Sequence, residues 1–254
     1  MHRSGTTLLV RLLERCGVFM GAQQTRNGES IFFQNINKEI LDLFGCSWRC
    51  LDFLPDPDKM QRHFKWLYTK VDRYLKSGLI YKYWGLIDSL RLLRTPSLSW
   101  GWKDPRNSLT LQIWQRIFPS ALIVHIIRDG RDVALSLLQR EIKRESGKDI
   151  FNEIEKRSRF IEYLSLWESY IQNIKGILPL FKNPYTIKYE QLLSTPLQEL
   201  KTLLLTLNIS FRGSLNDVIS IVDSSRANHY THIDIPWARG LADTSPLLKD
   251  LGYI

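Results

Sequence analysis

Apolar residues recur at helical spacing along much of the chain. The first helix is expected from Thr6, where the leucines of TTLLVRLLERC share one face and Gly17 supplies the stop. A threonine followed by proline, in the capping box Thr195–Gln198, predicts a helix that runs to about Leu207. Further helices are predicted over residues 31–44, 59–76, 109–118, 130–140 and 152–175.

Three stretches have the pattern of β-strands. Residues 121–127 (ALIVHII) form a nearly continuous β-branched run, which is typical of a strand buried on both faces of a parallel sheet. Residues 98–103 alternate like a short strand that stops at Asp104, and residues 185–188 form another. Because strands alternate with helices, the pattern predicts an α/β fold with a mainly parallel central sheet flanked by helices. Residues after about Ser224 carry no clear pattern.

Length and composition narrow the class of protein. A chain of 254 residues, with 44% apolar and 24% charged residues, is expected to form one soluble globular domain over residues 1–254. Its net charge of +9 favours an acidic partner, such as a polyphosphate, an acidic polymer, nucleic acid or an anionic membrane. A basic surface that is merely solvated is the alternative.

The cysteines and the apolar runs bear on location. Cys16, Cys46 and Cys50 are sparse and cannot all pair, which favours a reducing compartment, and we therefore predict a cytoplasmic protein. No second Cys or His pair stands at zinc-binding spacing, so no metal site is expected. No apolar run reaches the roughly 18 residues needed to span a bilayer.

The loop RSGTT opens directly into the first predicted helix. Gly5 lets the backbone turn tightly and approach a ligand, and the amides and dipole of the helix N-terminus attract an anion. Hydroxyl donors and a permanent charge come from the rest of the loop, namely Arg3, Ser4, Thr6 and Thr7. The loop is not a Walker A motif, which needs a longer span between glycines and then a lysine. A capped helix start beside a surface arginine is the alternative.

A second candidate anion site follows the ALIVHII strand, in the segment RDGRDVALS (residues 128–136). Open α/β sheets bind ligands at the carboxyl ends of their strands. Arg128 can fork onto a phosphate there, and Ser136 on the next helix can close on the same group. Asp129 and Asp132 are expected to cap the helix and orient the arginines. A purely structural ion pair of Arg128 is the alternative.

Together, the two motifs resemble the 5′-phosphosulfate and 3′-phosphate loops of the sulfotransferases that use 3′-phosphoadenosine 5′-phosphosulfate (PAPS). Residues 101–106 (GWKDPR) are similar to the family's Lys-Asp-Pro segment, and residues 187–193 (IKYEQLL) to its Tyr-Glu-Asp-Leu segment. The ending LGY at 251–253 is similar to that of bacterial members, so the likeness is greatest to the bacterial and tyrosylprotein-type branch. The resemblance implies a P-loop-like three-layer fold. It also implies sulfuryl transfer from PAPS, without a metal, to a hydroxyl or amine.

The resemblance implies a role for each matching residue. Arg3 with the loop amides would grip the 5′-phosphosulfate, and Lys103 would stabilise the leaving phosphate at the bridging oxygen. Arg128 and Ser136 would hold the 3′-phosphate. An ordinary strand-end lysine paired with Asp104 is the alternative for Lys103. The implied nucleotide-binding residues are Arg3, Ser4, Gly5, Thr6, Thr7, Arg128, Ser136, Tyr189 and Arg239, the last in an Arg-Gly pair similar to a late family loop.

The general base is harder to assign. Cytosolic members carry a histidine two residues after the corresponding lysine, and here that position is Pro105. The glutamate of the tyrosylprotein branch aligns with Gln24, which cannot accept a proton. Glu29 is the nearest carboxylate, resembles an acidic position in bacterial members, and is the predicted base. A surface or helix-capping role is the alternative.

The acceptor is not identified by the sequence. A small molecule, a glycan or a peptide is expected, and residues 20–100 and 140–175 are expected to line its site. His229 and His232 fall in an irregular segment that could cover the cleft, whereas His125, within a buried strand, is expected to be a hydrogen-bonded core residue. Base-stacking motifs are not evident, so nucleic acid is not an expected partner.

One departure from the family concerns the start of the chain. Members carry an apolar β-strand before the first loop, whereas this sequence begins Met1-His2-Arg3, so the domain is expected to lack that strand. A start assigned too late, a fragment and a degenerate protein are the three explanations, and we favour the first. The strand is central in the sheet, and its loss would expose the edges of its neighbours.

Two other functions compete with the transferase. A P-loop kinase or nucleotidase is disfavoured because the Walker lysine and a clear magnesium-binding acidic pair are missing. A non-catalytic or N-terminally truncated relative that binds a nucleotide or an acidic polymer by charge attraction is the other alternative.

Overall fold

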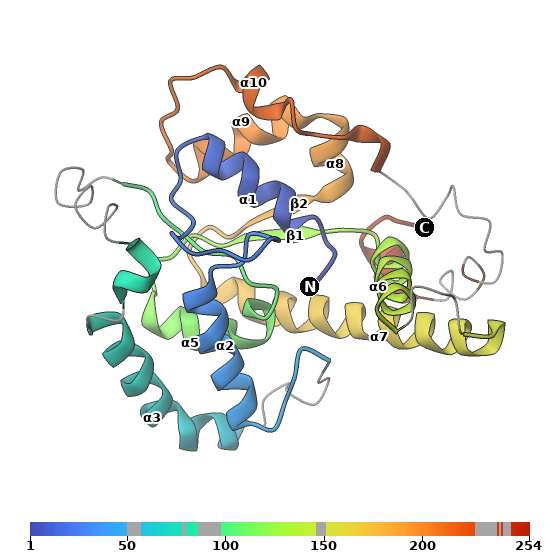
Figure 1. The fold of residues 1–254 in the computed structure, drawn as a ribbon, viewed down its shortest axis with the longest axis horizontal. Coiled ribbons are helices and arrows are strands. Elements are labelled where there is room, and N and C mark those ends of the chain that lie inside the picture. Colours follow the sequence, from blue (N-terminus) through green and yellow to red (C-terminus); the bar gives the residue numbers. More distant parts are fainter. Residues whose placement is uncertain are drawn as a thin grey trace.

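Two short parallel strands lie at the centre of the fold. β1 (Val124–Ile127) pairs in parallel with β2 (Tyr185–Lys188). The computed structural model describes residues 1–49, 57–77, 80–85, 98–145, 151–226, 238, 240 and 245–254. Helices surround the strand pair, so the predicted α/β class is confirmed (Figure 1).

One group of helices covers one face of the strand pair (Figure 1). Leu12 of the first helix, Ile126 of β1 and Ile187 of β2 belong to a single buried cluster. Burying such aliphatic side chains stabilises the fold by about 1.5–3 kcal/mol each. The helices of this group are α1 (Thr6–Arg15), α8 (Tyr189–Ser194), α9 (Pro196–Thr206) and α10 (Leu215–Ile219).

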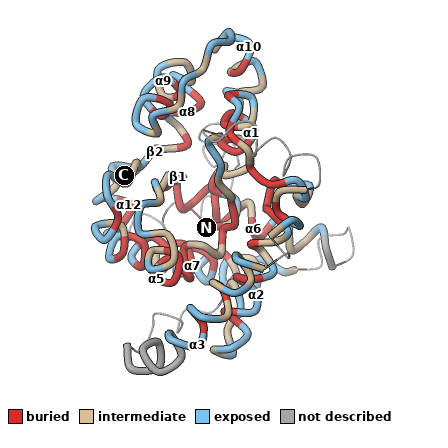
Figure 2. Tube along the Cα trace, turned by 90° about the vertical axis from the view of Figure 1, so that its left-hand side faces the viewer, coloured by how far each residue is buried: buried red, intermediate tan, exposed pale blue. Residues whose placement is uncertain are grey.

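A second group of helices packs on the opposite face (Figures 1 and 2). Ile127, next to Ile126 along β1, belongs to this second cluster together with Trp167, because successive strand residues point to opposite faces. The helices of this group are α2 (Ile31–Leu43), α3 (Pro57–Lys76), α5 (Asn107–Ile117), α6 (Gly130–Glu145), α7 (Glu153–Ile177) and α12 (Pro246–Asp250). Single 3₁₀ turns lie at Leu178–Leu180 and Ser224–Arg226.

The ends of two helices show how local chemistry sets them. Asn152 caps α7 and accepts from the Glu155 amide at 2.9 Å, while the Glu155 carboxylate accepts from the Asn152 amide at 2.8 Å. The capping box predicted at Thr195 is wrong. Its hydroxyl donates back to the Gln191 carbonyl at 3.1 Å, because the short helix α8, which the sequence pattern did not reveal, ends there.

Two strand predictions need correction. Residues 98–103 form only an isolated parallel bridge, in which the Phe19 amide donates to Ser99 and the Gly101 amide donates to Phe19, both at 2.9 Å. The predicted strand at 121–127 is shorter and begins at Val124. Alternation of apolar residues therefore marked extended backbone correctly, but it did not show how many residues would find a ladder partner.

The cysteines agree with the expectation that they cannot all pair. Cys16 is a buried free thiol, whereas Cys46 is disulfide-bonded, and a disulfide is not what a reducing compartment favours. The cytoplasmic location therefore stays a prediction. In the part of the chain that the structure describes, no helix combines the length and apolarity needed to cross a membrane.

Candidate functional site

The RSGTT loop forms the entry to α1, as predicted. Gly5 adopts the left-handed conformation with φ of 85°, and a Cβ placed on it would lie 2.1 Å from Cδ2 of Tyr189. The ring of Tyr189 therefore packs directly against the backbone of the loop, which only glycine permits. Arg3 also has a positive φ, of 68°, which is uncommon for a residue with a side chain.

The structure brings the two predicted anion motifs together. Nε of Arg3 donates to the Ser136 hydroxyl at 2.7 Å, and Nη1 of Arg128 donates to the Arg3 carbonyl at 3.2 Å. The guanidinium of Arg128 also lies 4.8 Å from the centre of the Tyr189 ring. Residues more than 120 positions apart thus form one cationic cluster of Arg3, Arg128 and Ser136 at the carboxyl end of β1.

The two aspartates of the second motif orient its arginines, as expected. Asp132 accepts from Arg128 at 2.9 Å, and Asp129 forms a bidentate pair with Arg131 at 2.8 and 3.0 Å. Burial raises the pKa of Asp129, although the hydrogen bonds and charge of Arg131 oppose that shift. The carboxylates therefore hold the loop backbone and aim the guanidinium groups.

Lys103 and Glu29 form a buried ion pair next to the first loop. Nζ of Lys103 lies 2.8 Å from Oε1 of Glu29, and the side chains are only 10% and 7% exposed. Lys103 also donates to the Asn27 carbonyl at 2.8 Å, and the same carbonyl accepts from the Thr7 hydroxyl at 2.9 Å. The carbonyl of Asn27 thus ties the lysine to the RSGTT loop.

The charges of this pair are tuned by opposing effects. Burial alone would raise the pKa of Glu29, but the hydrogen bonds from Lys103 and Thr25 outweigh it and hold that pKa below its ordinary value. Burial lowers the pKa of Lys103, while its hydrogen bond to Glu29 and that charge limit the shift. At neutral pH Glu29 is therefore an ionised carboxylate that can accept a proton.

Lys103 is not the ordinary strand-end lysine of the alternative interpretation. Its ion pair is with Glu29, whereas Asp104 is paired with Arg106 at 3.1 Å. Gln24, the other aligned candidate for the base, turns away, and its amide donates to Glu14 of α1 at 2.5 Å. Of the two candidates, Glu29 is the one beside Lys103.

A buried polar network behind Lys103 was not found from the sequence. Asn37 donates to Asp104 at 3.1 Å, and its carbonyl oxygen accepts from Thr110 at 2.7 Å and from Trp114 at 2.8 Å. Asn37 is fully buried on the apolar face of α2. A lone amide at a core position of an amphipathic helix was the signal, because a buried polar group needs partners. The network anchors the segment that carries Lys103.

The structure describes some of the remaining candidate site residues and not others. Ser4 is buried at the loop, and Tyr189 is 6% exposed beneath Arg128. Arg239, His229 and His232 lie outside the described residues. Within the described ranges, no group of three or more His, Cys, Asp or Glu side chains is placed to hold a metal ion.

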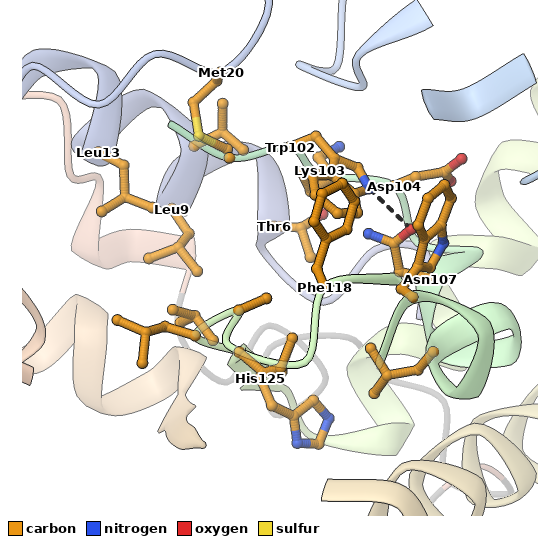
Figure 3. Close-up of a pocket in the computed structure, with 18 of the residues that line it drawn as sticks. Thr6, Leu9, Leu13, Met20, Trp102, Lys103, Asp104, Asn107, Phe118 and His125 are labelled. Atoms are coloured by element: carbon orange, nitrogen blue, oxygen red, sulfur yellow. Dashed lines mark hydrogen bonds between the residues drawn. The ribbon is translucent and has the colours of Figure 1, made fainter. Parts of the chain in front are cut away.

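A cavity of about 710 Å³ opens beside Lys103 (Figure 3). Leu9, Leu13 and Met20 face it from one side and Phe118 from another, and His125 also contributes to its lining (Figure 3). Its walls are mainly apolar. The cavity therefore lies among the residues that carry the chemistry, but most of its lining belongs to the interior of the fold.

Two extended segments bound this cavity. Residues 99–101 pair on one side with Phe19, and β1 pairs on one side with β2. Among the described residues β1 has β2 as its one ladder partner, and the edge of β1 toward the cavity is unpaired. His125 on that strand is 8% exposed, and its Nδ1 has no hydrogen-bond partner, so the expected hydrogen bond is not found there. The cavity is a gap between two strand-like segments.

Comparison with known proteins gives a family match and a fold match. A model of the sulfotransferase family matches residues 1–213. The solved sulfotransferase domain from the curacin biosynthetic pathway is similar in fold, with a TM-score of 0.53 and 17% sequence identity, over 92% of this chain and 89% of that one. No curated protein matches the chain. On the family match, which covers most of its length, the chain belongs to the sulfotransferase family.

Proposed function

We propose that the protein transfers a sulfuryl group from PAPS to a hydroxyl or amine of a small molecule, a glycan or a peptide. One observation carries the proposal: the buried Lys103–Glu29 pair lies against the anion-binding loop through the Asn27 carbonyl. A cation and an ionised carboxylate beside an oxyanion loop are the groups that an in-line sulfuryl transfer needs.

Three cationic groups would bind the donor. The amides and hydroxyls of the RSGTT loop and Nζ of Lys103, which lie together through the Asn27 carbonyl, would contact the 5′ side, where charge builds up on the leaving phosphate. Arg128 and Ser136 would hold the 3′-phosphate. Because Nε of Arg3 donates to Ser136 at 2.7 Å, we assign Arg3 to the 3′-phosphate as well. Each such charge-assisted bond contributes about 1.5–3 kcal/mol.

The transfer step uses the pair in two roles. The acceptor oxygen or nitrogen forms a bond to sulfur while the bond from sulfur to the bridging oxygen breaks. Glu29 accepts the proton of the acceptor, and Lys103 neutralises the negative charge that the departing phosphate gains. Both groups stand within hydrogen-bond distance of each other, so binding of the donor would exchange the Lys103–Glu29 contact for contacts to the reactants.

The proposal includes a P-loop-like three-layer sheet with one further strand. Parallel strands lie about 4.8 Å apart, and one strand between residues 99–101 and β1 would fill the gap between them. An N-terminal extension of about five β-branched residues should therefore raise the melting temperature, whereas a Gly/Ser extension of equal length should not. Equal melting temperatures for the two extensions would contradict the strand.

Calorimetric titration with adenosine 3′,5′-bisphosphate, the product nucleotide, tests the donor site. Arg128→Ala should weaken binding by roughly 10- to 100-fold, because a charge-assisted contact to phosphate is lost. Arg15→Ala is the matched control, since Arg15 lies at the far end of α1 and donates to the Asp217 carbonyl. Equal loss in both variants, or no binding by the unmodified chain, would overturn the proposal. Binding without turnover would instead favour the non-catalytic alternative.

A further inference from the structure

The C-terminal tail, residues 251–253, lies against the second anion motif, residues 128–136, at the junction of β1 and α6 (Figure 1). Nη2 of Arg131 donates to the Tyr253 carbonyl at 2.7 Å. Lys188 at the end of β2 donates to the Leu251 carbonyl and lies 4.9 Å from the centre of the Tyr253 ring. The tail is thus held from the start of α6 and from the end of β2, although residues 128–131 and 251–253 are far apart in the sequence.

Glu190 joins this tail to the loop backbone. One carboxylate oxygen accepts from the Asp129 amide at 2.9 Å, and the other accepts from the Tyr253 hydroxyl at 3.1 Å. Burial raises the pKa of Tyr253, so its hydroxyl stays a donor at neutral pH. The carboxylate is therefore a bridge between the residue that follows Arg128 and the end of the chain.

The segment that carries Glu190 also touches the first loop. Tyr189 packs against Gly5 on one side and beneath the Arg128 guanidinium on the other. Lys188, Tyr189 and Glu190 are consecutive, so one short segment contacts the first loop, the second loop and the tail. Any shift of this segment moves the backbone of Asp129 and the support of Arg128 together.

We infer that Glu190 and Tyr253 are positioning residues that aim Arg128 at the 3′-phosphate of the nucleotide. The inference rests on the proposed function, because it concerns the same phosphate. Neither residue needs to touch the ligand. Their contacts fix the Asp129 amide and the Arg131 side chain, and through these the loop from which Arg128 projects.

Tyr253→Phe tests the inference because it removes one hydroxyl and keeps the ring. The dissociation constants of adenosine 3′,5′-bisphosphate and of adenosine 5′-monophosphate are measured by calorimetry. The dissociation constant of the monophosphate divided by that of the bisphosphate is the ratio that reports recognition of the 3′-phosphate. Loss of one positioning hydrogen bond should reduce this ratio by about 3- to 10-fold. General destabilisation would weaken both nucleotides alike and leave the ratio unchanged.

Tyr185→Phe is the matched control. Tyr185 begins β2 and donates to Glu199 at 3.3 Å, so this variant removes another Tyr–Glu hydrogen bond, at the end of β2 away from the phosphate loops. Its ratio should equal that of the unmodified chain. Glu190→Gln is a second variant, because the amide oxygen can still accept from Asp129 while the negative charge is lost, and it should reduce the ratio as well.

The outcomes separate the two claims. If the unmodified chain prefers the 3′-phosphorylated nucleotide and both Tyr253→Phe and Glu190→Gln keep that preference, the inference is wrong and the proposed function stands. If the unmodified chain binds neither nucleotide, or binds both equally, the proposed function fails and the inference with it. A reduced ratio in both variants, with Tyr185→Phe unchanged, supports the inference.

Discussion

Gly5→Ala perturbs the contact on which both phosphate motifs depend. The added Cβ would lie 2.1 Å from Cδ2 and 2.5 Å from Cε2 of Tyr189, so the ring or the loop must move by more than an ångström. The φ of 85° adds a backbone cost of about 1–2 kcal/mol, and overpacking adds about 1–3 kcal/mol. The free energy of unfolding should therefore fall by roughly 2–5 kcal/mol.

Gly17→Ala separates these two contributions. Gly17 has nearly the same φ, 88°, but nothing lies within 4 Å of the position of its added Cβ. It should therefore cost only the backbone part, about 1–2 kcal/mol. Urea unfolding of both variants measures the difference, and titration with adenosine 3′,5′-bisphosphate measures its effect on the site. Binding should weaken in Gly5→Ala alone, because Tyr189 supports Arg128.

Equal destabilisation in the two glycine variants would refute this reasoning, since the Tyr189 contact would then carry no cost. A double variant, Gly5→Ala with Tyr189→Leu, provides a further check. The smaller side chain should relieve part of the clash, so the two substitutions should not be additive in the free energy of unfolding.

Three further perturbations have defined outcomes. Lys103→Met should lower kcat by about 10²- to 10³-fold, because its charge acts on the leaving phosphate, and should also weaken binding of the product nucleotide, which keeps that phosphate; an unchanged kcat would contradict that role. Glu29→Gln should lower kcat by about 10²- to 10⁴-fold. Because the pKa of Glu29 in the free protein is held below its ordinary value of 4.5, the kcat/KM of the unmodified enzyme should fall only as pH drops below that value, and an acid limb of kcat/KM near neutral pH would count against Glu29. Burial lowers the pKa of His125 to about 3, so below about pH 6.5 the unfolded chain binds a proton that the folded chain does not. As the pH falls from the higher to the lower of these two pKa values, the free energy of unfolding should therefore decrease by about 1.4 kcal/mol per pH unit. Urea unfolding of His125→Gln over the same pH range should show a smaller decrease in the free energy of unfolding.

The sequence predicted the elements whose residues repeat at a clear period. The helix after the RSGTT loop, the long helix at Glu153–Ile177 and the strand at Tyr185–Lys188 all lie where the pattern indicated. Helix α8 was missed because six residues are too few to show a period, and it follows β2 without a break. The strand at 98–103 was overestimated because pairing depends on a neighbour that local alternation does not reveal.

The candidate site was predicted in its parts but not in its joining. Resemblance indicated Lys103, Glu29 and Arg128 separately, and the structure adds the Lys103–Glu29 pair at 2.8 Å. The contact of Arg3 with Ser136 could not be read from the sequence, because 133 positions separate them and only the fold brings them together. The network around Asn37 was likewise hidden, since its partners come from a different helix and from the Lys103 segment.

Turnover of PAPS itself tests the central claim most directly. Radiolabelled PAPS is incubated with the protein and a panel of hydroxyl and amine acceptors, and labelled product and adenosine 3′,5′-bisphosphate are quantified by chromatography. The account predicts that both form in equal amounts with the unmodified chain and at least about 100-fold more slowly with Lys103→Met. Intact PAPS with every acceptor, together with magnesium-dependent consumption of ATP, would contradict sulfuryl transfer and favour a kinase.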